Sequence, residues 1–250
     1  MGGDWGYPVI SPDELIRDHK EAIVIINVGN PGDANEIIGR LVVGGIPQSR
    51  ILEGTRYGTR FTKRAYFVED FLRYEDEEIF VDGGSYDLET TKFFKNICPA
   101  LKKPYAFEPD KENFKKCEKK KTLEALDYIE LLPYGVWSEN TTLRFTGTGL
   151  TNSRVDFSAM QEIEVRSIDS ITAGDPVTFI KMDVEGSELE ALKGAEQTIR
   201  KYHPKLAISV YHKPEDLFEI PQYIKTIAPD YKLYLRHYSS FCGETVVYAV

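Results

Sequence analysis

The chain has few cysteines and no long apolar segment. Its three cysteines, Cys98, Cys117 and Cys242, are scattered through 250 residues and form neither an even disulfide framework nor the close spacing of a metal site. No apolar run approaches the ~20 residues needed to cross a membrane, and no charged-then-apolar signal peptide is present. These absences predict a cytoplasmic protein in a reducing compartment, without a membrane partner.

Positive charge is also scarce, since 31 Lys and Arg stand against 40 Asp and Glu and leave a formal net charge of −9. Binding along a phosphate backbone requires basic stripes, so we expect no nucleic-acid partner. The one lysine-rich run, residues 115–121, has apolar residues at helical spacing around it and is typical of a solvated helix face.

The length allows one substantial core with room for a small appendage. Strands and helices alternate from about residue 61 onward, which predicts a main domain at 61–250. Residues 1–60 read as a partial α/β segment, possibly the remnant of a larger domain and too small to fold well alone. Two roles stay open for this segment: packing on the main domain, or self-association.

The main domain is predicted to be a doubly wound α/β fold with a seven-stranded, mostly parallel sheet. The expected strands are Ile79–Gly83, Pro104–Phe107, Ile129–Val136, Val177–Met182, Lys205–Tyr211, Tyr231–Arg236 and Thr245–Ala249, and the last two form an antiparallel hairpin because a short loop joins them. The expected helices are Glu89–Asn96, Lys111–Leu126, Glu188–Tyr202 and Glu215–Ile227, and a polar excursion carries two more strands, Thr142–Phe145 and Glu162–Arg166.

A glycine-containing turn follows the first core strand, in the segment Asp82-Gly83-Gly84-Ser85-Tyr86. The glycines let the backbone turn tightly and approach a ligand, and the next helix directs free N–H groups toward the same place. Glu108 stands where the second strand of a βαβ unit should end, and its carboxylate can accept hydrogen bonds from both ribose hydroxyls. The pattern predicts an adenosine cofactor, bound by Asp82, Gly83, Gly84, Ser85, Tyr86, Glu108, Pro109, Val136 and Asp183.

Acidic residues in this turn decide between adenosine cofactors. A dinucleotide needs G-x-G-x-x-G, so that its pyrophosphate can lie on a helix N-terminus. Here Asp87 and Glu89 stand in that place and would repel a pyrophosphate, whereas they favour the sulfonium and ammonium charges of S-adenosylmethionine. The turn therefore favours S-adenosylmethionine over NAD, and a role of Asp87 only as a helix cap is the less favoured alternative.

A second acidic segment follows the strand Val177–Met182. Asp183 and Glu185 come directly after it, where ligands of open α/β sheets bind. Ser187 and Glu190 are expected to form a capping box for the next helix, and Glu188 is read as a helix-start acid. If the first and fourth core strands are neighbours, Asp82, Asp183 and Glu185 line one crevice.

Several segments together carry a family resemblance. They are Phe80-Val81-Asp82-Gly83-Gly84-Ser85, Phe107-Glu108-Pro109, Ile180-Lys181-Met182-Asp183-Val184-Glu185-Gly186, Leu192-Lys193-Gly194-Ala195 and Ser209-Val210-Tyr211-His212-Lys213. Over roughly residues 66–250 the chain resembles the FkbM family of S-adenosylmethionine-dependent methyltransferases. The resemblance implies a Rossmann-like class I methyltransferase fold and O-methylation of a sugar or secondary metabolite. Leu88 stands where the family commonly has a further glycine, so we expect a tighter cofactor cleft.

Methyl transfer to a hydroxyl requires a group that takes up its proton. His212 is the preferred base, with a purely structural role in its loop as the alternative, while His203 and His237 look structural. Asp183 could orient His212, act as base, or help Glu185 hold a divalent cation, so Asp183, His212 and Glu185 are the catalytic candidates. A cation is not predicted but stays possible. The expected acceptor is a small molecule or a saccharide, and an NAD-dependent oxidoreductase or a non-catalytic cofactor-binding domain remain alternatives.

Overall fold

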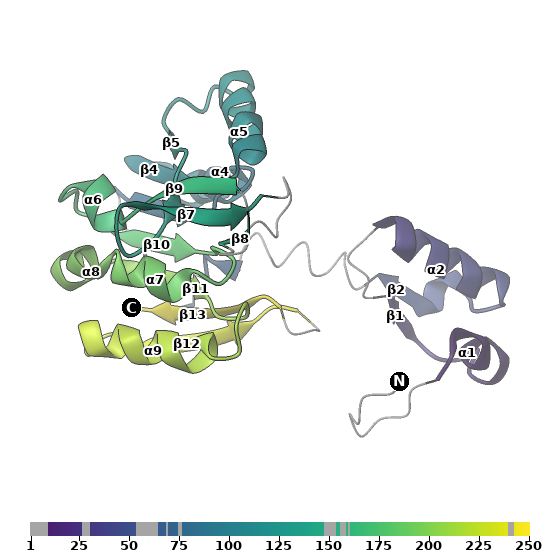
Figure 1. Cartoon of the computed structure of the whole chain (residues 1–250). Helices are drawn as coiled ribbons and strands as arrows, with labels where there is room; N and C mark the ends of the chain where they lie inside the picture. The colour runs from purple at the N-terminus through teal and green to yellow at the C-terminus, as the bar shows by residue number, and fades with distance from the viewer. Residues whose placement is uncertain are drawn as a thin grey trace. The chain divides into compact units, whose positions relative to one another are not determined.

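The computed structural model describes residues 10–26, 31–53, 65–68, 70–74, 77–147, 154–155, 159, 161–239 and 243–250. The chain divides into two compact units, Met1–Phe61 and Thr62–Val250, each of which is considered by itself (Figure 1). Within the described ranges, no helix has both the length and the apolar character that a membrane span requires.

The first unit is a small α/β piece. It contains α1 (Pro12–Asp18), β1 (Val24–Ile26), α2 (Pro31–Val43), a 3-10 turn (Gln48–Arg50) and β2 (Ile51–Glu53). The Ser11 hydroxyl accepts the Glu14 N–H at 3.1 Å and so caps α1, as its position predicts. Strands β1 and β2 pair in parallel, and Ile26, Leu41 and Ile46 are buried in the core of this unit.

The second unit is built on a seven-stranded sheet in the order β12-β13-β11-β10-β3-β4-β5. The strands are β3 (Ile79–Gly83), β4 (Lys103–Phe107), β5 (Glu130–Leu132), β10 (Phe179–Met182), β11 (Lys205–Ser209), β12 (Leu233–His237) and β13 (Thr245–Ala249). All neighbours pair in parallel except β13, which runs antiparallel to both β11 and β12. The predicted doubly wound sheet with its terminal hairpin is therefore confirmed.

Helices cover both faces of this sheet (Figure 1). They are α4 (Glu89–Ile97), α5 (Lys111–Leu123), α6 (Ile168–Thr172), α7 (Glu188–Lys193), α8 (Glu196–Tyr202) and α9 (Asp216–Ile227). Because side chains alternate along a strand, Val81 faces the core formed with α6 to α9. Its neighbour Phe80 points to the other face and packs with Phe94 of α4 and with Phe179. A strand buried on both faces reads as a continuous apolar run, which is why β3 and β10 were recognisable from sequence.

The predicted strand Ile129–Val136 is wrong as a single element. Pro133 has no N–H to continue the ladder, and the segment divides into β5 and the short β6 (Gly135–Val136). Strand β6 belongs to a second sheet in the order β6-β9-β7-β8, with β7 (Thr141–Thr146), β8 (Arg154–Val155) and β9 (Gln161–Arg166). This small sheet contains the two strands predicted for the polar excursion, and it carries Val136 to the edge of the site.

The predicted helix Glu188–Tyr202 is also wrong as a single element, because it is interrupted at Gly194 between α7 and α8. A Cβ at Gly194 would lie 2.0 Å from the Trp137 carbonyl oxygen, so only glycine permits this approach of the two backbones. The predicted capping box is absent, since Ser187 makes no side-chain cap. The Glu188 carboxylate instead accepts the Val184 N–H at 2.8 Å.

Candidate functional site

A cavity of about 220 Å³ opens at the carboxyl ends of β3, β4 and β10. Seven of the predicted cofactor residues line it: Gly84, Ser85, Tyr86, Glu108, Pro109, Val136 and Asp183. The cavity lies where an open α/β sheet binds its ligand. Its lining also includes Tyr66, Tyr134 and Lys181, which the sequence did not single out.

Glu108 directly follows β4 and is 5% exposed. Its Oε1 accepts the Asp110 N–H at 2.9 Å, and burial raises the pKa of its carboxyl to about 7. Close by, the Ser85 hydroxyl is buried and has no hydrogen-bond partner among the described residues. A buried acid and a buried unpaired hydroxyl beside an empty volume suit a ligand that offers hydroxyl and amine groups, so these residues fit the predicted adenosine cofactor.

Asp82 and Gly83 lie beneath the cavity and do not line it. Asp82 is fully buried, accepts the Thr91 hydroxyl at 2.7 Å and forms an ion pair with Lys181 at 3.0 Å. Lys181 also donates to the Gly84 carbonyl at 2.8 Å and to the Gly83 carbonyl at 3.2 Å. Asp82 therefore holds the glycine turn through Lys181, which differs from the direct cofactor contact that the sequence predicted.

Gly84 has the positive φ of 79° that glycine adopts at little cost. A Cβ at this position would lie 1.9 Å from the Asp183 carbonyl oxygen. The close approach that the glycine permits is thus between the turns after β3 and β10. It brings Asp183 next to the cofactor turn.

Leu88 does not narrow the cavity, so the predicted tighter cleft is not found. Its side chain is fully buried, packed with Ala106, Cys117 and Ile129. Its φ of 65° is left-handed, a conformation that glycine adopts more easily. Asp87, one position before the N-cap residue Leu88 of α4, accepts the Glu89 N–H through its Oδ1 at 3.0 Å and so satisfies one free N–H of the first turn.

Replacing Leu88 with glycine is expected to lower the free energy of unfolding by about 1–2 kcal/mol and to leave S-adenosylmethionine affinity unchanged. The variant loses roughly 2–3 kcal/mol of buried side chain and recovers about 1 kcal/mol from relief of the left-handed backbone. Leu88→Ala is the matched control, because it loses the side chain but keeps the strain. Urea denaturation should show a lower free energy of unfolding for Leu88→Ala than for Leu88→Gly. The reverse order would contradict a left-handed backbone at residue 88.

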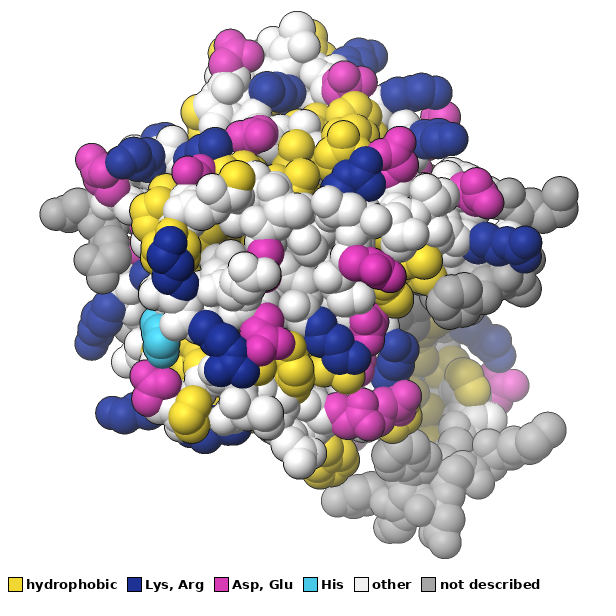
Figure 2. Space-filling view, turned by 60° about the vertical axis from the view of Figure 1, so that its left-hand side comes forward, with side chains coloured by type: hydrophobic (Ala, Val, Ile, Leu, Met, Phe, Trp, Pro, Cys, Tyr) yellow, Lys and Arg dark blue, Asp and Glu magenta, His cyan; other side chains and the backbone are white. Residues whose placement is uncertain are grey.

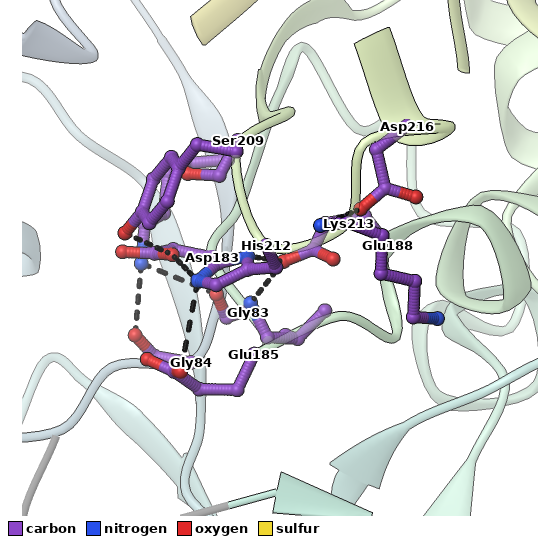
Figure 3. Close-up of polar contacts among 12 residues, drawn as sticks. Gly83, Gly84, Asp183, Glu185, Glu188, Ser209, His212, Lys213 and Asp216 are labelled. Atoms are coloured by element: carbon purple, nitrogen blue, oxygen red, sulfur yellow. Dashed lines mark hydrogen bonds and ion pairs between the residues drawn. The ribbon is translucent and has the colours of Figure 1, made fainter. Parts of the chain in front are cut away.

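Asp183 and Glu185 lie in the turn after β10, where the sequence placed them. Asp183 Oδ2 accepts the Tyr66 hydroxyl at 2.8 Å, and Oδ1 accepts the Tyr211 hydroxyl at 3.2 Å. Glu185 has a φ of 54°, which is unusual for a residue other than glycine. Figure 3 shows both carboxylates beside His212, whose Nε2 lies 3.5 Å from Asp183 Oδ1 and 3.6 Å from Glu185 Oε2. The three predicted catalytic candidates therefore converge.

Glu188 holds the other side of the His212 ring (Figure 3). Its Oε1 lies 2.9 Å from His212 Nδ1, and the Glu188 side chain is fully buried. Burial alone would lower the pKa of His212, but the carboxylates of Glu188, Asp183 and Glu185 raise it to about 9. The ring is thus cationic at neutral pH in the free chain. The sequence predicted Glu188 only as an acidic residue at a helix start, and its contact with His212 was not foreseen.

The two histidines that were expected to be structural lie elsewhere in the fold. His203 ends α8 in a left-handed cap, with Nε2 3.3 Å from the Asp230 carboxylate. His237 lies in β12, with its Nδ1 2.8 Å from the Thr245 hydroxyl.

A second cavity of about 390 Å³ adjoins this cluster. It is lined by Trp137, Val155, Glu185, Gly186, Ser187, His212 and Lys213. Glu185, Ser187 and Val155 line both cavities. The Asp183–Glu185–His212 group therefore stands where the two cavities meet.

Comparison with known proteins identifies the family. The profile described as the methyltransferase FkbM domain matches residues 81–234, more than half of the chain. The methyltransferase FkbM of Methylobacillus flagellatus KT is 28% identical, with a TM-score of 0.65 over 96% of this chain and 58% of that protein. This chain thus spans less than two thirds of that relative's length.

A precorrin-6y C5,15-methyltransferase of Geobacter metallireducens GS-15 has a TM-score of 0.50 at 9% identity, over 76% of this chain and 86% of that one, which shows a shared fold. No curated protein sequence matches the chain. The profile match carries the identification. The chain belongs to the FkbM family of S-adenosylmethionine-dependent methyltransferases.

Proposed function

We propose that the chain transfers the methyl group of S-adenosylmethionine to a hydroxyl of a small-molecule or saccharide acceptor. The observation that carries the proposal is the pair of adjoining cavities, with Asp183, Glu185 and His212 at their junction. One cavity contains the residues suited to adenosine, and the other offers room for an acceptor. On the face in Figure 2, basic and acidic side chains are interspersed without a basic stripe, which agrees with a small acceptor.

In this proposal, two polar residues of the cofactor cavity contact the adenosine part of the cofactor. Glu108 would hold the ribose hydroxyls, and the Ser85 hydroxyl would gain the partner that it lacks. When bound, S-adenosylmethionine supplies an activated methyl group.

The second cavity suits an acceptor with an oxygen-rich surface. Trp137 offers an aromatic face, while Lys213 and Glu185 offer charged groups for hydrogen bonding. A hydroxyl placed at the junction would face Asp183, which Tyr66 and Tyr211 hold in one orientation. Asp183 is therefore proposed to orient the acceptor hydroxyl and take up its proton, with the charged His212 ring beside it.

Calorimetric titration of the purified chain with S-adenosylmethionine and with NADH tests the cofactor assignment. We expect heat with the first ligand only. Heat with NADH alone would contradict the proposal and indicate an NAD-dependent oxidoreductase. No heat with either ligand would indicate a non-catalytic domain. Incubation with labelled S-adenosylmethionine and a panel of sugars and polyols then tests the acceptor class, since label must appear as a methyl ether.

Replacing Glu108 with glutamine is expected to weaken S-adenosylmethionine binding by about 30-fold or more, or about 2 kcal/mol, as charge-assisted hydrogen bonds are lost. Ribose hydroxyls favour the ionised carboxylate, so the bound state should lower the pKa from about 7. Wild-type affinity should therefore rise with pH up to about 7 and then level off. Titrations with S-adenosylmethionine between pH 5.5 and 8.5 should show this rise in affinity for the wild type. The affinity of the variant should not change with pH in this way. Equal affinity in a folded variant would remove Glu108 from the ribose site.

A further inference from the structure

The Asp183–Glu185–His212 group has the geometry of a cation site. One donor atom from each side chain lies within 4.8 Å of the other two. Two donors that each lie about 2.1 Å from one cation are roughly 3.0 Å apart at an octahedral angle and roughly 3.4 Å apart at a tetrahedral angle. The distances from His212 Nε2 to the two carboxylates, 3.5 Å and 3.6 Å, are close to that range. Small side-chain rotations would complete a three-ligand site.

Outer contacts hold two of the three side chains, His212 and Asp183, in place. Glu188 faces His212 Nδ1 at 2.9 Å, which leaves Nε2 directed at Asp183 and Glu185. Carboxylate–histidine pairs of this kind are the usual support of metal-bound imidazoles. Glu188 is itself fixed by the Val184 N–H at 2.8 Å. The Tyr66 and Tyr211 hydroxyls hold Asp183 from the side.

The backbone bends at the same place. Glu185 has a φ of 54° and Gly186 a φ of 90°, so two successive residues of the turn are left-handed. Such a conformation costs of order 1 kcal/mol for a residue with a side chain and tends to persist at functional sites. It directs Glu185 back toward Asp183, two positions before it. An uninterrupted helix start would not require this bend.

We propose that Asp183, Glu185 and His212 bind one divalent first-row cation at the junction of the two cavities. Two carboxylates and one imidazole make a mixed oxygen and nitrogen set that suits Mn²⁺ and its neighbours in the series. The imidazole binds in its neutral form, so the cation takes the place of a proton on Nε2. Three protein ligands leave coordination positions open for an acceptor oxygen.

The role of the cation rests on the proposed function. An acceptor hydroxyl bound to the cation is a stronger acid, so its O–H bond breaks. Because Asp183 is then a ligand of the cation, the proton passes to water and not to Asp183. The electron pair on oxygen forms the new bond to the methyl carbon. The carbon–sulfur bond breaks and its pair stays on sulfur, which leaves a methyl ether and S-adenosylhomocysteine.

Titration of the full chain with Mn²⁺ alone, after removal of metals with EDTA, tests the site directly. Electron paramagnetic resonance of free Mn²⁺ should show one binding site per chain. Glu185→Gln and His212→Gln should each weaken it by about tenfold or more, as loss of a ligand requires. His203→Gln is the matched control, since His203 also faces a carboxylate, Asp230, but lies outside the site.

Two outcomes would overturn the site: no binding to the wild-type chain, or equal affinity in both ligand variants. Circular dichroism and S-adenosylmethionine titration of each variant show that it is folded, and either variant alone decides the question if the other unfolds. Undiminished methyl transfer in the presence of EDTA would refute the catalytic role of the cation and leave the proposed function intact. If the chain binds Mn²⁺ but shows no heat with S-adenosylmethionine, the cation site is supported and the proposed methyltransferase function is refuted.

Discussion

Replacing Lys181 with methionine is expected to lower the free energy of unfolding by about 3–5 kcal/mol. The Lys181 side chain is 2% exposed, and its ammonium group pairs with the fully buried Asp82 at 3.0 Å. It also donates to the carbonyls of Gly83 and Gly84. Methionine fills a similar volume but leaves the Asp82 charge in the interior, where the Thr91 hydroxyl is its one remaining side-chain hydrogen-bond donor among the described residues. Urea denaturation followed by circular dichroism measures the loss.

A double variant separates the charge from the packing in this experiment. Adding Asp82→Asn to Lys181→Met removes the uncompensated charge, so the pair of changes should cost less than Lys181→Met alone. A double variant that is less stable than the single one would contradict the ion-pair account. Lys205→Met is a useful comparison, because that lysine pairs with the buried Glu78 at 2.9 Å but is farther from the glycine turn.

The sheet could be predicted because its central strands have a recognisable sequence pattern. Strands β3 and β10 are apolar on both faces, and each is followed by residues with a clear backbone or ligand preference, Gly84 and Asp183. The two wrong elements have different causes. At Pro133 the missing N–H ends the ladder locally, whereas the break at Gly194 reflects the close approach of a distant partner, the Trp137 carbonyl. Periodicity alone carries no information about that partner.

Site residues that directly follow a strand could be predicted from the sequence, whereas site residues in other positions could not. Asp183, Glu185 and His212 come just after β10 and β11, so strand ends were sufficient to place them together. Tyr66 contacts Asp183 across a separation of 117 residues, and no motif around it signals that contact. Lys181 was visible within the family segment, but its role needed the knowledge that β10 lies beside β3. The roles assigned to these residues in binding and catalysis remain predictions.

Replacing Asp183 with asparagine is expected to slow methyl transfer by about a hundredfold or more while leaving S-adenosylmethionine affinity within about threefold of the wild type. The amide keeps the size of the carboxylate and can still accept the Tyr66 hydroxyl, now at 2.8 Å from Oδ2. It loses the negative charge that faces the acceptor hydroxyl, whether that charge takes up a proton or holds a cation. Single-turnover rates and calorimetric affinities of the same preparation provide the two readouts.

Tyr211→Phe is the matched control for Asp183→Asn. It removes one hydrogen bond to Asp183, 3.2 Å long, and leaves the carboxylate charge in place. A positioning contact of this length is worth about 1 kcal/mol, so the turnover should fall by only about fivefold. Near-normal turnover of Asp183→Asn would exclude Asp183 from the chemistry. A parallel loss of cofactor affinity would instead assign Asp183 to cofactor binding, because its carboxylate lines the cofactor cavity as well as the junction.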